Sequence, residues 1–516
     1  IAHHTEQPVN EIPWDPLNDT QTQELIRQSD TIGCFYIESP ATRLLLRKLW
    51  KAMTQTRQSK LDVFDYVVMV SSLVRPAGNP YNRDFVLRAH GESHQPVHPL
   101  FEDVLADTHG LMVYQEDVTK VAMAVAGFSV DDADQLRKVL SKKHKKRQLQ
   151  DYQTQFSRGA RAEGASEHAI TTMWNMIMSF AGYSFCKAHS ASYAQVSFQS
   201  TYLRAHYPAE FMAAVVNNQG GFYSIFVYLS EARRMGLRIL PPDINVSHWD
   251  YTGNDNTIRM GFRQIKGIKV EMIESLLEIR SKHGPFQSFQ NFLTRTKEEP
   301  AQTRLLVKAG CFDSIAGEVT RPGLLWRLHA HCGIQATKHT QPLRFDMLLA
   351  LPIPPDYPPN QKIQHEIELF GFPFTTHPLE LYTKAFQGFT HVPACDMHQH
   401  VGHTITMIGW MITEKSVQTK KREPMEFVTL EDLTGLYEAT FFPKTYRQFG
   451  HLLTNQGPYI LEGVVEEEFH TYSLVVKKVC TLTTHASPHL PMLNQTVTRK
   501  GSTNVCKEQE ARGYMI

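Results

Sequence analysis

The sequence predicts a multidomain α+β protein with a large α-helical N-terminal region, a helix-hairpin-helix region and a C-terminal OB-type β-barrel. Three observations carry this prediction. The chain has 516 residues, too many for one core, because domains average about 150 residues. Up to about residue 241, apolar residues recur with helical spacing between loops rich in glycine and proline. Beyond residue 402 the period changes to that of β-strands.

The composition predicts an ordinary globular protein without a membrane span. Apolar residues make up 42% and charged residues 20% of the chain, and no apolar run is long enough to cross a bilayer. The seven cysteines include no Cys-x-x-Cys pair, which argues against a disulfide framework and favours the cytoplasm. The chain starts with Ile1 and shows no signal peptide, so we expect it to come from inside a longer reading frame.

The segment 181–194 predicts a helix start that carries groups able to bind an anion. Gly182 ends an apolar run, and a new helical pattern begins near Ser190 and continues to residue 206. Lys187, His189 and Ser190 then lie at a helix N-terminus, where free N–H groups and the helix dipole favour a phosphate. The alternative is that these residues only cap and pack the helix.

A basic stripe follows an N-cap signature formed by Ser129 and Asp132. No acidic residue lies between 135 and 147, which contain Arg137, Lys138, Lys142, Lys143, Lys145, Lys146 and Arg147. On a helix, Lys138 lies opposite the apolar side formed by residues 136, 139 and 140, as Lys142 and Lys145 do. The stripe is either a solvated face or a phosphate-binding surface.

Residues 261–269, followed by an apolar-periodic helix, resemble a helix-hairpin-helix module. Such a hairpin offers backbone N–H groups to a DNA phosphate and reads no sequence. Lys266, Gly267 and Lys269 are the candidate DNA contacts. Lys269 occupies the position of a second glycine, so it either distorts the turn or adds a phosphate contact. A purely structural helical hairpin is the alternative.

Five strands are predicted at 404–412, 426–431, 438–442, 459–465 and 472–479, as in a small OB-type barrel. The first hairpin, 415–422, contributes the candidate DNA contacts Lys415, Lys420, Lys421 and Arg422. Such barrels bind single-stranded nucleic acid or serve as protein-interaction modules. A proline-rich linker is predicted at 339–361, and the polar tail beyond residue 485 is expected to be disordered.

Metal ligation is not expected within this chain. His398, His400 and His403 form a cluster without a convincing fourth ligand, so chance clustering explains them better than a metal site. The acidic residues 131–134 are better explained by helix capping than by metal binding. Phosphoryl transfer with Mg²⁺ needs carboxylates brought together on a rigid element, and the sequence offers no such arrangement.

Several fragments together resemble one family, the α subunit of bacterial DNA polymerase III, a C-family DNA polymerase. They are residues 33–39 (GCFYIES), 73–76 (LVRP), 114–116 (YQE), 126–128 (AGF), 133–138 (ADQLRK), 184–194 (SFCKAHSASYA), 206–214 (HYPAEFMAA), 240–245 (LPPDIN), 310–313 (GCFD) and 377–379 (HPL). The resemblance covers nearly the whole chain.

The resemblance implies an order of domains. The fingers are expected at 1–240, a helix-hairpin-helix DNA-binding region at 241–335, a linker and small connecting segment at 336–400, the OB domain at 401–482 and a tail at 483–516. In this family the palm, with its metal-binding aspartates, precedes the fingers. We therefore expect Mg²⁺ to be bound upstream of Ile1 and no catalytic residue within this chain.

The resemblance also implies site residues. Arg137 and Lys138, with Lys142 and Lys143 nearby, resemble contacts to the triphosphate of an incoming deoxynucleotide. Tyr183, Lys187, His189 and Ser190 resemble neighbours of its sugar and phosphates, and Arg75 is a further candidate DNA contact. A weak sliding-clamp motif consists of Gln341, Leu343 and Phe345.

Three departures from the family pattern concern these sites. Lys138 stands where the family often has arginine, and a lysine binds phosphate as a point charge and not as a fork. Cys186 replaces a commoner Asn or Ser. Residues 76–79 (PAGN) depart from the usual proline-glycine-proline, as in divergent or error-prone relatives.

We therefore expect part of a DNA-directed DNA polymerase that binds dNTP and primer-template DNA in replication or error-prone repair. The expected partners also include a sliding clamp and other holoenzyme or mutagenesis proteins. The alternative hypothesis is a catalytically silent paralogue that binds DNA or polymerase partners. The coding sequence upstream of Ile1 would distinguish the two.

Overall fold

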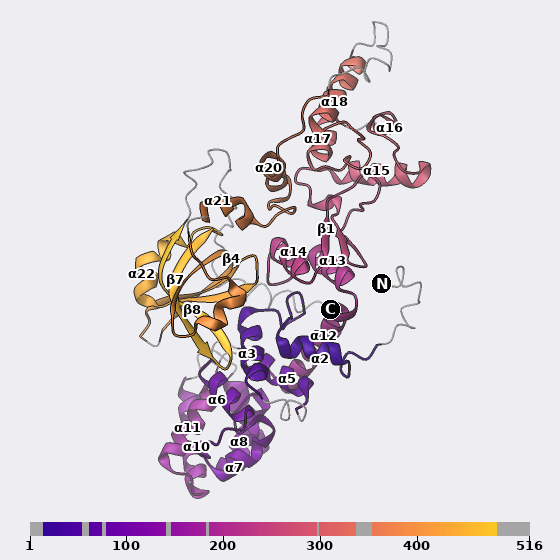
Figure 1. The fold of residues 1–516 in the computed structure, drawn as a ribbon. Helices are drawn as coiled ribbons and strands as arrows, with labels where there is room; N and C mark the ends of the chain where they lie inside the picture. Colours follow the sequence, from indigo (N-terminus) through magenta and orange to yellow (C-terminus); the bar gives the residue numbers. More distant parts are fainter. Residues whose placement is uncertain are drawn as a thin grey trace. The chain divides into compact units, whose positions relative to one another are not determined.

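A computed structural model describes residues 14–53, 61–74, 79–140, 146–181, 185–296, 299–336, 353–386, 389–419 and 421–481. The chain forms two compact units (Figure 1). Unit 1 comprises Ile1–Ser224 with Glu467–Tyr472, and unit 2 comprises Ile225–Glu466 with Ser473–Ile516. Each unit is described by itself.

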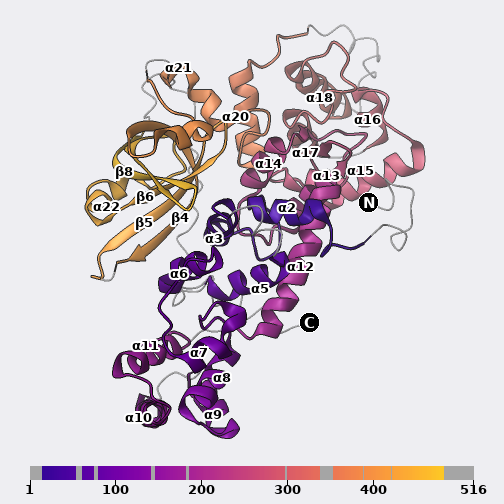
Figure 2. The ribbon, with the colours of Figure 1, turned by 60° about the horizontal axis from the view of Figure 1, so that its bottom comes forward.

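Unit 1 is helical, as the sequence predicts, and the long helix α12 (Lys187–His206) is central to it. The first helices, α2 (Thr20–Gln28), α3 (Pro40–Lys51), α5 (Val63–Leu73) and α6 (Asn79–Ala89), lie near one another, and α12 packs against α2 and α5 (Figure 2). Asp19, Ser39 and Asp62 each accept a backbone hydrogen bond as N-caps. Helix α13 (Pro208–Asn218) begins at a proline, whose fixed φ suits the first turn of a helix.

A second group of helices completes unit 1. It consists of α7 (Pro99–Val104), η2 (Ala106–Thr108), α8 (Gln115–Ala126), α9 (Val130–Leu140), α10 (Lys146–Ala162) and α11 (Glu167–Met178). The predicted cap of α9 is confirmed, because Ser129 Oγ accepts from the Asp132 amide at 3.1 Å. Helices α8 and α10 approach closely at Gly159, where a Cβ would lie 1.9 Å from the carbonyl oxygen of Ala126.

Unit 2 begins with α14 (Ile225–Arg234) and a small sheet of strands β1 (Arg238–Leu240), β3 (Thr257–Arg259) and β2 (Thr252–Asn254), in that order. Strand β3 is parallel to β1 and antiparallel to β2. The strands have three residues each, too few for a periodic pattern, which is why the sequence indicates only helices and loops here.

The helix-hairpin-helix region follows this sheet. After η3 (Phe262–Gln264) come α15 (Val270–His283), α16 (Phe289–Arg295), α17 (Pro300–Lys308) and α18 (Arg321–Ala336). The apolar side predicted for α15 is buried at Ile273 and Leu276. The rings of Phe286, Phe289, Phe292 and Phe312 pack together, with centroid separations from 4.8 to 6.4 Å. The connecting segment contains α20 (Pro359–Phe370), η4 (Pro378–Tyr382), α21 (Thr383–Phe386) and η5 (Ala394–His400).

The C-terminal strands form a closed barrel in the order β4-β5-β6-β8-β7, which is the strand order of an OB fold (Figure 1). The strands are β4 (Thr404–Gln418), β5 (Pro424–Glu431), β6 (Leu436–Phe441), β7 (Tyr459–Glu468) and β8 (Thr471–Thr481). Helix α22 (Pro443–Phe449) and η6 (Gly450–Leu452) lie between β6 and β7 in the chain, and β8 pairs with β6 in parallel.

The five predicted strands are confirmed, with one correction. The first strand does not end near residue 412 but continues to Gln418, so Lys415 lies within β4 and not in a hairpin loop. Residues 413–418 are polar and poor in apolar residues, yet each pairs with a residue of β5. Backbone pairing therefore extends the strand beyond the region where an apolar pattern marks it.

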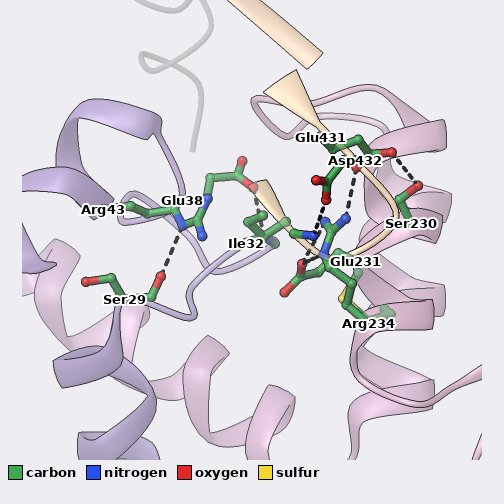
Figure 3. Close-up of polar contacts among 12 residues, drawn as sticks. Ser29, Ile32, Glu38, Arg43, Ser230, Glu231, Arg234, Glu431 and Asp432 are labelled. Carbon is green, nitrogen blue, oxygen red and sulfur yellow. Dashed lines mark hydrogen bonds and ion pairs between the residues drawn. The ribbon is translucent and has the colours of Figure 1, made fainter. Parts of the chain in front are cut away.

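A buried carboxylate joins the barrel to two other parts of unit 2. Glu431, the last residue of β5, is fully buried and accepts hydrogen bonds from Ser230 Oγ at 3.0 Å and Arg234 Nη1 at 2.9 Å (Figure 3). His377 Nδ1 accepts from the Leu379 amide, so its Nε2 carries the proton and donates to Glu431 at 2.7 Å. Burial raises the pKa of Glu431, but the bonds from His377 and Arg234 outweigh it and lower that pKa below its ordinary value.

Candidate nucleotide and nucleic-acid interface

The structure places the residues predicted at a helix start on the first turn of α12. The helix begins at Lys187, and its N-cap, Cys186, makes no side-chain capping bond. Lys187 and His189 are exposed, as a ligand-binding role requires. Ser190 is buried instead, and its Oγ lies 2.6 Å from Ser72 Oγ of α5. The Ser190 hydroxyl therefore contacts α5 within the helix packing.

The start of α12 is joined to the start of α8 by three contacts. The Glu116 carboxylate accepts the Lys187 amide at 3.2 and 3.3 Å. The Gln115 amide donates to the carbonyl oxygen of Phe185 at 2.9 Å. The Lys187 ammonium lies 5.6 Å from the centroid of the Tyr114 ring. A carboxylate of the protein thus occupies a position at the positive end of the α12 dipole, where an anion is favoured.

The basic stripe on α9 carries an acidic partner. Asp134 Oδ1 lies 2.7 Å from Arg137 Nη2, and Asp134 Oδ2 lies 2.7 Å from Lys138 Nζ. Hydrogen bonds from Lys138 and then Arg137 lower the pKa of Asp134. The run 135–147 has no acid in sequence, but one turn of helix brings the preceding aspartate beside both cations.

The hairpin of the helix-hairpin-helix region contains a left-handed glycine. Gly267 has φ +81°, a conformation that favours glycine. Lys266 and Lys269 are both exposed, as a DNA contact requires. The Lys266 amide, however, donates to the carbonyl oxygen of Leu369 at 2.8 Å, so this backbone group is used within the protein.

Lys269 is engaged through both its backbone and its side chain. Its amide donates to Gln302 Oε1 at 2.8 Å, and Gln302 Nε2 in turn donates to the Gly267 carbonyl oxygen at 3.1 Å. Its ammonium lies 2.8 Å from Glu299 Oε1, and this hydrogen bond raises the pKa of Lys269. The amide at the second glycine position of the hairpin therefore already has an acceptor.

The first hairpin of the barrel presents cations beside an aromatic ring. Lys415 of β4 is exposed and pairs directly with Phe427 of β5, whose side chain is 42% exposed. Lys421 and Arg422 are exposed in the turn, where Arg422 has φ +61°. Together these residues place a ring and positive charge on one face of the barrel, an arrangement typical of surfaces that bind single strands.

Several predicted contacts lie outside the residues that the structure describes. These are Arg75, Lys142, Lys143, Tyr183 and Lys420, together with the clamp motif Gln341, Leu343 and Phe345.

Two aromatic features were missed by the sequence analysis. Phe427 lies between the inward-facing Glu426 and Val428, and strand alternation would have placed it on the outer face. Phe35 is 44% exposed in a loop that packs on α12. No local periodicity marks that loop, so only the fold shows its position.

Within the described ranges, no group of three or more His, Cys, Asp or Glu side chains is arranged to hold a metal ion. Among the described helices, none is both long and apolar enough to cross a membrane.

Residues 2–164 match the family model described as the bacterial DNA polymerase III alpha subunit finger domain, and residues 236–321 match that of the helix-hairpin-helix motif. A match to a polymerase finger domain, a match to a helix-hairpin-helix motif and an OB-type barrel therefore follow one another along the chain. Over most of its length, the chain resembles bacterial DNA polymerase III α subunits.

Three relatives match most of the chain. It is 31% identical over 493 residues to DNA polymerase III subunit alpha of Saccharopolyspora erythraea, covering 89% of this chain and 40% of that protein. It is 32% identical over 477 residues to the protein of the same name from Aquifex aeolicus, covering 90% of this chain and 39% of the relative. The Staphylococcus aureus (strain Mu50) protein is 29% identical over 503 residues, with coverages of 96% and 45%. The chain thus spans less than half the length of these relatives.

Proposed function

We propose that this chain forms the nucleotide- and DNA-binding portion of a template-directed DNA polymerase. The observation that carries the proposal is the exposed pair Lys187 and His189 on the first turn of a 20-residue helix, α12. In the same chain, residues 2–164 match the model of the polymerase finger domain. A cation and an imidazole at the positive end of a helix dipole suit the phosphates and sugar of a deoxynucleoside triphosphate.

The DNA would be bound by separate surfaces. The hairpin at Lys266 and Lys269 suits the backbone of a duplex, and the face around Lys415 suits a single strand. Arg137 and Lys138 supply further charge for the triphosphate, in competition with Asp134. A sliding clamp and other replication or mutagenesis proteins are the proposed partners, and the cytoplasm is the proposed location.

Divalent metal would take part in the transfer of the nucleotide, because Mg²⁺ neutralises charge that develops on the phosphates. The described residues do not fit such a site, since none of their carboxylates form a suitable group. From the resemblance, we expect that site in the palm. The contribution of the described residues is to bind and orient the substrate.

The proposal is tested by titrating the chain with dATP and with inorganic tripolyphosphate. Lys187→Ala is expected to weaken the binding of both ligands by about 5- to 10-fold. This is a loss of about 1–1.4 kcal/mol in binding free energy, typical of a charged contact at a helix terminus. Lys120→Ala, which removes an exposed lysine from α8, is the matched control. Equal binding by parent and Lys187→Ala would contradict the site.

A silent paralogue would bind DNA without supporting synthesis. Primer extension by the longest natural protein that contains this chain separates the two hypotheses. Extension that depends on Lys187 supports the polymerase, whereas intact DNA binding without extension supports the paralogue.

A further inference from the structure

The Tyr114 ring lies beneath the side chain that is proposed to bind phosphate. The Lys187 ammonium is over this ring, 5.6 Å from its centroid. The next two residues of the chain contact backbone groups at the start of α12, because the Gln115 amide donates to the Phe185 carbonyl oxygen and the Glu116 carboxylate accepts the Lys187 amide. Tyr114 instead contacts the side chain of Lys187.

The Tyr114 ring is buried, and the backbone that carries it is fixed. The residue is 4% exposed, and Val113 before it is fully buried. Asp117 Oδ2 accepts the amides of Val113 and Tyr114 at 2.9 and 2.8 Å. These two N–H groups stand just before the first turn of α8, and Asp117 is itself buried. A buried carboxylate three residues along the chain therefore sets the position of the ring.

The surroundings keep the Tyr114 phenol neutral. Burial, and then the charge of Asp117, raise the pKa of Tyr114 above its ordinary value. Burial also raises the pKa of Asp117 and outweighs the hydrogen bonds that its carboxylate accepts from the amides of Tyr114 and Val113. A neutral phenol attracts a cation through the face of its ring and forms no ion pair. The contact thus orders the Lys187 ammonium without neutralising its charge.

Such ordering matters for lysine, because its side chain is long and flexible. Lys187 is exposed, and an exposed lysine loses rotamer freedom when its ammonium is fixed on a phosphate. A ring that already restricts the ammonium takes part of this loss before the phosphate arrives. Removal of the ring would restore the lost freedom and weaken the phosphate contact, although the charge of Lys187 is unchanged.

We propose that Tyr114 is a positioning residue for Lys187, whose ammonium it holds on the face of a fixed ring for the phosphates of a nucleotide. The proposal rests on the proposed function, because it requires Lys187 to bind phosphate. The role belongs to the ring and not to the hydroxyl group. Phenylalanine at position 114 should therefore replace tyrosine, whereas an aliphatic residue should not.

The first experiment measures the affinity of the full chain for tripolyphosphate. Tyr114→Leu should weaken binding by about 2- to 5-fold, the range of a cation–ring contact at an exposed site, and Tyr114→Phe should bind as the parent does. Phe101→Leu is the matched control, because it removes a fully buried ring from α7, which also packs on α8. Equal affinities of the parent and Tyr114→Leu would overturn the proposal.

A double-variant cycle separates positioning from packing. In a Lys187→Ala background the ring has no ammonium to hold, so Tyr114→Leu should have no further effect on affinity. If Tyr114→Leu weakens binding by the same factor in both backgrounds, the ring acts through packing and the proposal is overturned. Tighter binding by Tyr114→Leu would also overturn it, because the ring would then hold the ammonium away from the phosphate.

The ring contact is also measured without phosphate. In the full chain with carbon-13 dimethylated lysines, the methyl signal of Lys187 is identified by its absence in Lys187→Arg. The Tyr114 ring should shift this signal upfield, Tyr114→Leu should remove the shift and Tyr114→Phe should keep it. An unshifted Lys187 signal in the parent would overturn the proposal.

The two proposals fail in different ways. If Lys187→Ala binds tripolyphosphate as the parent does, the proposed nucleotide site fails, and the positioning role fails with it. If Lys187→Ala weakens binding and Tyr114→Leu does not, the positioning role alone fails. Loss of affinity in Tyr114→Leu, recovery in Tyr114→Phe and no further effect in the Lys187→Ala background together support it.

Discussion

The Glu116 carboxylate lies 3.2 Å from the backbone amide of Lys187, across 71 residues of sequence, at the start of the helix proposed to bind phosphate. The bond satisfies an N–H group that has no partner within the helix. It also places a negative charge where a triphosphate would carry its own. Glu116 and a bound phosphate therefore compete for the same helix terminus.

Replacing Glu116 by glutamine tests this competition. Glutamine keeps the hydrogen-bond acceptor but removes the charge, so Glu116→Gln should tighten tripolyphosphate and dATP binding by about 2- to 5-fold, the range expected for a charge at a helix terminus. Titration calorimetry at low ionic strength measures the change in affinity for both ligands. Glu92→Gln, an exposed carboxylate elsewhere in unit 1, should change nothing. Weaker binding by Glu116→Gln would show that the carboxylate supports the site.

The shared carboxylate on α9 predicts opposite effects for the acid and its cations. Asp134→Asn releases Arg137 and Lys138 and, under the proposed function, should lower the KM for dNTP in primer extension by the longest natural protein that contains this chain. The double change Arg137→Ala and Lys138→Ala should raise that KM, or lower kcat, far more than it weakens primer-template affinity. Arg161→Ala removes an arginine that is also paired, with Glu167, and serves as control. Unchanged nucleotide kinetics in the double variant would rule out a triphosphate contact.

The contacts of the helix-hairpin-helix hairpin predict that its two lysines, Lys266 and Lys269, contribute unequally to the binding of duplex DNA. The Lys269 ammonium is shared with Glu299, so Lys266→Ala should weaken binding to duplex DNA more than Lys269→Ala. Lys266→Ala should also reduce the slope of log K against log salt by about 1, as loss of one phosphate contact requires. Glu299→Gln should increase affinity. Filter binding at several salt concentrations checks all three variants. If the slope of log K against log salt is the same for the parent and the three variants, the hairpin does not bind the duplex.

The paired residues on the barrel predict different salt responses. Lys415→Ala should weaken binding to oligo-dT and flatten its salt dependence, because one phosphate contact is lost. Phe427→Ala should weaken binding by about 1–3 kcal/mol with the salt slope retained, because stacking carries no charge. Fluorescence anisotropy across a salt series measures both. If neither variant differs from the parent, this face of the barrel does not bind a single strand.

The buried Glu431 predicts a pH-dependent stability of unit 2. A carboxyl group whose pKa is lowered on folding stabilises the fold above its unfolded pKa, near 4.5, and this contribution is lost as the pH falls through the folded pKa. Glu431→Gln removes one of the two carboxylates that pair with Arg234. It should therefore lower the free energy of unfolding by about 3 kcal/mol at pH 7. Calorimetry should show the difference between parent and variant shrinking below pH 4.5. If the difference in stability between parent and variant does not change with pH, the substitution acts through packing and not through the charge of Glu431.

Much of the fold follows from short-range signals. The hydroxyl of Ser129 caps α9 from within three residues, and the apolar side of α15 repeats within one turn. The order of helices, hairpin and barrel therefore follows from patterns a few residues long. The small sheet around Ile258 does not follow from such patterns. Its strands are too short for a periodic pattern, and β1 pairs with β3 across about 20 residues of sequence.

The sequence by itself determined which residue types and which local elements are present, including the cations at the start of α12 and in the hairpin. Only the tertiary structure decided which of those groups already have partners. Gln302 reaches the Lys269 amide from 33 residues away and Glu116 reaches the Lys187 amide from 71. Helices and strands depend on backbone and side-chain preferences within a few residues, whereas the partner of a charge or an amide depends on how distant elements pack, which no local pattern encodes.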